Sequence, residues 1–92
     1  MKTEQKIKTY RLQLNSIDQE LFLLCKKRIL IAKKIVKLKQ ENNIEICDLA
    51  RENKIENIFY KKVMKLTSKK RVKAFIKSLF ELNPYYPIKN KS

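Results

Sequence analysis

The chain has 92 residues, and 23 lysines and arginines against 9 aspartates and glutamates give it a formal net charge of +14. Its length allows one small domain, its 43% hydrophobic content is that of a folded chain, and its charge favours an anionic partner. Glycine and histidine are absent, which excludes glycine-rich phosphate loops and removes the most frequent general base and metal ligand.

Cysteine content and hydropathy indicate the compartment. The two cysteines, Cys25 and Cys47, are too few for a zinc site, and their spacing is not that of a redox pair. We therefore expect both to be small apolar residues in a reducing compartment. The first residues lack the apolar core of a secretory signal, and charges interrupt every hydrophobic run before it could cross a bilayer. The simplest expectation is a cytoplasmic protein that neither enters a membrane nor holds a metal.

A first, unusually long helix is predicted over residues 4–42. Its apolar residues recur at alternating spacings of three and four, the pattern that packing against another helix selects. The members of this apolar seam are Ile7, Tyr10, Leu14, Ile17, Leu21, Leu24, Ile31, Ile35 and Leu38. Such a helix would be about 55 Å long, and the rest of the chain is too short to cover it. A partner chain is therefore expected.

A loop and a second helix should follow. The stretch QENNIEIC at 40–47 breaks the helical period with paired asparagines and β-branched residues. A helix is then predicted over 48–66, with Asp48 as its N-cap. Arg51 and Glu52 would lie in its first turn, where backbone amides attract anions. This DLARE segment is either a cap with an exposed ion pair or a source of a hydroxyl-binding carboxylate and a guanidinium.

A third helix is predicted over residues 68–83, capped by Thr67 or Ser68 and ended by the proline-containing NPYYP. No repeat, low-complexity segment or linker divides the chain. The expected fold class is therefore all-α: one domain over residues 1–92 with one very long, one medium and one short helix, paired as an intertwined homodimer.

Arg28 occupies the position at which the apolar seam requires an apolar residue. A buried, unpaired guanidinium costs several kcal/mol, so Arg28 must meet a carboxylate or face a cavity that holds an anion. Arg28, Ala32, Ile35 and Lys39 share one helical face, with the two cations about 16 Å apart along the axis. These cations could converge on a compact anion. In contrast, five lysines on the flank are expected to face solvent: Lys26, Lys27, Lys33, Lys34 and Lys37.

Arg11 lies about 25 Å from Arg28 along the same helix, so one chain cannot bring both to a small ligand. An antiparallel partner could place its own copy beside Arg28. Spacing alone equally allows Arg11 to be an ordinary surface charge.

These segments together resemble the all-helical class of chorismate mutase, type II. That family combines an arginine and an Ile-Asp-x-x-Leu segment with a basic residue before an apolar–alanine pair. A lysine ends its long helix, and Asp-x-x-Arg-Glu begins its second. The chain shows these features in order in YRLQLNSIDQEL, KKRILIAKKIVKLK and ICDLARE, between Tyr10 and about Ile58. The resemblance implies a cofactor-free, metal-free isomerase that rearranges chorismate to prephenate in the shikimate pathway to phenylalanine and tyrosine.

The resemblance also implies which charged residues act. Arg28, Arg51 and Arg11 of the partner subunit would hold the two carboxylates of chorismate in the reactive diaxial conformer. Lys39 would donate to the ether oxygen, where negative charge develops as the C–O bond breaks. Each of two equivalent sites would thus be built from both chains of the dimer.

Four further residues would complete the implied pocket. Glu52 and the backbone of Asp48 would bind the ring hydroxyl, and Ile35 would press on the ring. Asn83 would stand where similar enzymes have a small polar residue on the third helix.

The third helix departs from the family pattern about one turn after that polar residue. Similar enzymes place a glutamine or glutamate there to assist the lysine, whereas this chain has Pro87 or Ile88. Neither side chain can donate a hydrogen bond. Tyr85, Tyr86 or Asn90 are the residues available to compensate.

Alternative functions remain open. An isochorismate-pyruvate lyase would use a similar cationic pocket, and a regulatory domain would bind chorismate without converting it. From a different class, the charge allows a basic nucleic-acid-binding helical dimer, although aromatic residues are not interleaved with basic ones and no recognition motif is present. A membrane-surface helix is disfavoured because the seam is narrow.

Overall fold

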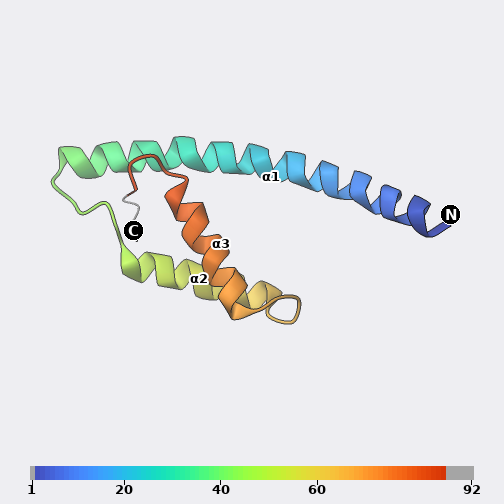
Figure 1. Cartoon of the computed structure of the whole chain (residues 1–92). Coiled ribbons are helices and arrows are strands. Elements are labelled where there is room, and N and C mark those ends of the chain that lie inside the picture. The colour runs from blue at the N-terminus through green and yellow to red at the C-terminus, as the bar shows by residue number, and fades with distance from the viewer. Residues whose placement is uncertain (1, 87–92) are drawn as a thin grey trace, which may run out of the picture. The chain divides into compact units, whose positions relative to one another are not determined.

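The computed structural model describes residues 2–86, which form three helices joined by two short connections (Figure 1). The helices are α1 (Lys2–Glu41), α2 (Leu49–Val63) and α3 (Lys69–Glu81). The prediction of an all-α fold with one long, one medium and one short helix is therefore confirmed. The second helix ends at Val63, earlier than the predicted residue 66, and the third ends at Glu81 rather than residue 83.

The end of α1 is a left-handed turn built on an asparagine. Asn43 has a φ of 56°, a conformation that glycine usually supplies and that asparagine tolerates better than most residues. The backbone N–H of Ile44 donates to the carbonyl of Lys39 at 2.8 Å, and that of Asn43 donates to the carbonyl of Gln40 at 3.4 Å. This is the Schellman arrangement. In a chain without glycine, Asn43 thus ends the long helix and directs the chain into the loop.

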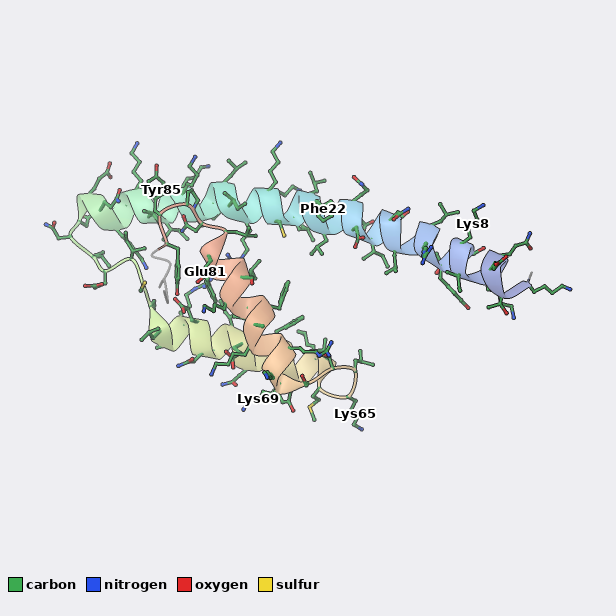
Figure 2. All side chains as sticks on the ribbon, in the orientation of Figure 1. Lys8, Phe22, Lys65, Lys69, Glu81 and Tyr85 are labelled. Atoms are coloured by element: carbon green, nitrogen blue, oxygen red, sulfur yellow. The ribbon has the colours of Figure 1, made fainter. Side chains whose placement is uncertain are left out.

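The chain divides into two compact units, Met1–Ile31 and Ala32–Ser92. The described part of the first unit is helix alone, and its apolar side chains have no cover within the unit. Leu14 is 55% exposed and Leu24 is 60% exposed. Phe22, labelled in Figure 2, is 60% exposed as well. The predicted seam is therefore present on the helix but remains accessible to solvent in the single chain.

The second unit contains a small core. Helices α2 and α3 pack against each other (Figure 1). Between them, the rings of Phe59 and Phe75 lie 5.3 Å apart from centroid to centroid. Val72 and Ile76, spaced by four on α3, are almost fully buried, as is Val36 near the end of α1. Burial of this apolar surface is the main stabilising term available to the unit, since no other described residue is buried to the same degree.

The turn between α2 and α3 is basic and is held by a helix cap and a cation–π contact. Ser68 is the N-cap of α3, and its hydroxyl oxygen accepts a hydrogen bond from the backbone N–H of Arg71 at 3.2 Å. Of the two predicted caps, the structure therefore selects Ser68. The ammonium of Lys69 lies 5.7 Å from the centre of the Tyr60 ring, a cation–π contact between the two helices. Figure 2 labels Lys65, which lies within this turn, and Lys69, the first residue of α3.

Candidate active site

Lys39 is fixed to the loop that follows α1. Its side chain is half-buried, and its ammonium nitrogen Nζ donates a hydrogen bond to the carbonyl oxygen of Ile46 at 3.1 Å. Its own carbonyl oxygen accepts the N–H of Ile44 in the turn described above. Both the backbone and the side chain of Lys39 are thus tied to the loop. The ammonium of Lys39 therefore lies beside Ile46, two positions before Asp48, the N-cap of α2.

The first turn of α2 is organised by Asp48, as predicted. This residue has extended backbone angles, φ −130° and ψ 90°, and its carboxylate accepts the backbone N–H of Arg51 at 3.1 Å. The Asp48 carbonyl accepts the N–H of Glu52 at 3.0 Å. The cap therefore fixes the start of the helix, where the dipole and unpaired amides favour negative charge. It also fixes the position of Glu52 relative to the loop.

Glu52 is engaged by a residue from the far end of the chain. The phenol of Tyr86 donates a hydrogen bond to Oε2 of Glu52 at 2.6 Å, a short distance typical of a hydroxyl bonded to a carboxylate. Burial raises the pKa of Tyr86, and the hydrogen bond and charge of Glu52, followed by Cys47, raise it further. Tyr86 therefore stays protonated and acts as a donor at neutral pH.

Tyr86 is positioned by the turn that follows α3. The backbone N–H of Tyr86 donates to the carbonyl of Asn83 at 2.9 Å, and the Asn83 side-chain oxygen accepts the N–H of Tyr85 at 3.1 Å. The ring of Tyr86 stacks on that of Phe80, with centroids 6.1 Å apart and planes 26° from parallel. Asn83, predicted as a ligand-binding residue, is half-buried and uses its side-chain oxygen within this turn. Pro87, Ile88 and Asn90 lie outside the described residues.

The three predicted arginines differ in their exposure to solvent. Arg11 and Arg51 are exposed, whereas Arg28 is half-buried. Arg11 and Arg28 belong to the first compact unit. The other predicted site residues belong to the second unit and are Ile35, Lys39, Asp48, Arg51, Glu52 and Asn83. Within this second unit, the loop and its hydrogen bonds gather Lys39, Asp48 and Glu52 around the start of α2.

Two partners in this arrangement were not predicted from the sequence. The carbonyl of Ile46 is the acceptor for Lys39, and the hydroxyl of Tyr86 is the donor to Glu52. A backbone carbonyl carries no sequence signal, since every residue has one. The sequence indicates Tyr86 only as one of several residues that could replace the missing donor of the third helix. Its contact with Glu52, 34 positions away, leaves no pattern in the sequence.

Two surface pockets are lined by residues other than the predicted site residues. One, of about 510 Å³, is lined by Asn43, Ile44, Glu45, Ile46, Cys47 and Tyr85. The other, of about 580 Å³, is lined by Lys2, Gln5, Lys6, Thr9, Tyr10 and Gln13 on the first turns of α1. Neither includes a predicted site residue. For this reason neither pocket of the single chain is by itself the predicted site.

Within residues 2–86, no three histidine, cysteine, aspartate or glutamate side chains lie close enough to hold a metal ion. None of the three described helices combines the length and the apolar character needed to span a bilayer.

The described residues thus form an all-α fold of three helices, one of them long. Residues 10–83 match the family chorismate mutase type II. Since this match spans most of the chain, the protein belongs to that family. No curated protein and no solved structure matches the chain.

Proposed function

We propose that the protein is a chorismate mutase, an isomerase that converts chorismate to prephenate by an intramolecular Claisen-type rearrangement. Family membership supports this assignment, and one structural observation carries it. The hydrogen bond from Lys39 to Ile46 holds a half-buried ammonium beside the N-terminus of α2, where Asp48 and Glu52 are also fixed. A cation, a backbone cap and a carboxylate are thereby gathered at one turn of the second unit.

The charged groups suit the substrate. Chorismate carries two carboxylates, and guanidinium groups bind carboxylates through two parallel hydrogen bonds. Arg28, Arg51 and Arg11 of the partner subunit would hold the substrate in the diaxial conformer, in which the carbon atoms that must bond approach one another. Most of the work of the enzyme is then to fix a conformation and to stabilise charge, which requires no general base.

Lys39 has the central chemical role. In the rearrangement the ether C–O bond breaks while a C–C bond forms within the same molecule, and the ether oxygen gains negative charge. The ammonium of Lys39 would exchange its Ile46 acceptor for this oxygen and stabilise the charge. Glu52 and the Asp48 backbone would bind the ring hydroxyl, Asn83 would supply a small polar contact, and Ile35 would pack against the ring.

A homodimer with shared active sites is part of this proposal. Among its described residues, α1 buries only Val36, although it carries a seam of apolar residues along its length. Leu21, the least exposed leucine of that seam, is still 41% exposed, and Leu38 is 60% exposed. Apolar surface of this extent on one helix favours association, and a second copy of the same seam is its self-complementary partner. An antiparallel pairing would also bring Arg11 of the partner subunit to Arg28 and Lys39.

The test is a direct assay of chorismate consumption with identification of the product. Wild-type protein should produce prephenate, and Lys39→Ala should lower kcat by at least about 10²- to 10³-fold, the effect of removing one donor at a developing negative charge. Lys37→Ala is the matched control, because Lys37 is exposed on the same helix and its loss changes the net charge equally. Helicity measured by circular dichroism should not change, since alanine is a strong helix former.

The same assay separates the alternatives within the family. Release of pyruvate from isochorismate would identify a lyase, and chorismate binding in calorimetry without turnover would identify a regulatory domain. If wild-type protein neither binds nor converts chorismate, the assignment is refuted. Equal activity of Lys39→Ala and Lys37→Ala would refute the assigned role of the lysine.

A further inference from the structure

Tyr86 is held at three points in a part of the chain that carries no regular helix. Its backbone N–H bonds to the carbonyl of Asn83 at 2.9 Å, its ring stacks on Phe80, and its hydroxyl bonds to Glu52 at 2.6 Å. A side chain restrained at both its base and its tip has few alternative rotamers. The hydroxyl is therefore presented to Glu52 from a fixed direction.

This bond leaves Glu52 able to bind a second hydroxyl. An ionised carboxylate has about four lone-pair sites on two oxygens, and Tyr86 uses one of them on Oε2. Without Tyr86, the half-buried glutamate side chain would sample several rotamers, since it has three rotatable bonds. The phenol faces Glu52 on α2 and Cys47 in the loop, and burial together with their influence keeps it protonated.

We propose that Tyr86 is a positioning residue, whose hydroxyl fixes the Glu52 carboxylate in the orientation that accepts the ring hydroxyl of the substrate. The inference rests on the mutase function proposed above. The ring hydroxyl neither gains nor loses charge during the rearrangement, so its bond to Glu52 has the same strength in the ground state and in the transition state. Loss of the positioning should therefore weaken substrate binding and leave the chemical step nearly unchanged.

Tyr86→Phe tests this role, because it removes the hydroxyl and keeps the ring on Phe80. The expected result is a KM about 3- to 10-fold higher, the effect of leaving one flexible side chain to be ordered by the substrate, with kcat within about 2-fold of wild type. Tyr85→Phe is the matched control, since this exposed phenol lies one residue earlier, and its KM should not change.

A double mutant distinguishes positioning from packing. If Tyr86 acts through Glu52, then Tyr86→Phe should raise KM little further in a Glu52→Gln background. The phenolate absorbance transition that is lost in Tyr86→Phe should also occur at higher pH in wild type than in Glu52→Gln. The pH of this transition therefore reports the hydrogen bond between Tyr86 and Glu52 without a measurement of activity.

Several results would overturn the inference. They are an unchanged KM in Tyr86→Phe, additive effects in the double mutant, or parallel losses of kcat and thermal stability that indicate a packing role. Each of these requires an active wild type, so they leave the mutase function intact. Wild-type protein without turnover would instead overturn the proposed function, and the positioning role with it.

Discussion

The apolar seam of α1 gives the most discriminating test of the proposed dimer. Leu14 lies on the seam, whereas Leu12, two positions earlier, lies about 200° away around the helix. Both are exposed leucines on the same helix, Leu14 at 55% and Leu12 at 64%. Alanine at either position preserves helix propensity. The pair therefore differs mainly in the direction that each side chain faces.

The expected change in the dimer dissociation constant follows from the surface of Leu14 that a partner subunit would cover. Complete burial of a leucine side chain contributes about 1.5–3 kcal/mol. Covering the 55% of Leu14 that is exposed would contribute about 0.8–1.6 kcal/mol, and a twofold dimer contains two copies. Leu14→Ala should therefore raise the dissociation constant of the dimer by about 15- to 250-fold. Leu12→Ala should change it by no more than about 2-fold, as expected for a surface substitution.

Sedimentation equilibrium over a range of protein concentrations measures both dissociation constants. A second readout is specific activity on dilution, because each proposed site needs Arg11 of the partner subunit. The activity of Leu14→Ala should decline at higher protein concentration than that of wild type or Leu12→Ala. Equal dissociation constants for the two variants would refute the proposal that the seam forms the dimer interface. A wild-type protein that is monomeric at every concentration would refute it as well.

Two predictions concern the stability of the second unit, measured by urea denaturation at a fixed protein concentration. Asn43→Ala should lower the free energy of unfolding by about 1–2 kcal/mol because its φ of 56° is unfavourable for alanine, whereas Asn43→Gly should not. A stable Asn43→Ala variant would contradict the left-handed turn. Val72→Ala should cost about 2 kcal/mol because the side chain is 1% exposed, and Leu66→Ala, at an 83% exposed position, should cost less than about 0.5 kcal/mol. Similar losses at these two positions would mean that Val72 does not belong to the core.

The parts of the fold that were predicted depend on local rules. Apolar spacing predicts the helices, and the residue types that accept backbone N–H groups predict Asp48 as one cap. The same rule leaves Thr67 and Ser68 open for α3, and the structure has Ser68. The end of α2 was placed too late because Leu66 continues the apolar spacing beyond Val63, although it is 83% exposed in the following turn. Apolar periodicity shows which side chains could be buried. Burial also requires a neighbouring surface, and the pattern does not show whether one is present.

Around the candidate site, the sequence predicts only the geometry that is local to one element. The cap at Asp48 follows from residue type, and Glu52 follows from its place in the first turn. The contact between Glu52 and Tyr86 depends on the packing of α2 and α3 and on the turn after α3, which no local pattern specifies. The left-handed conformation of Asn43 was also missed, because paired asparagines indicate a loop without fixing which residue adopts a positive φ.

The two halves of the proposed site differ in what a single chain supplies. The residues proposed to bind the ring hydroxyl all belong to the second unit, where Asp48 caps α2 and Tyr86 donates a hydrogen bond to Glu52. The side for the carboxylates requires Arg11 of the partner subunit, which one chain cannot bring to Arg28. Dissociation should therefore abolish turnover while the Tyr86–Glu52 bond persists. In a diluted Leu14→Ala sample, the phenolate transition should still occur at raised pH after activity has been lost.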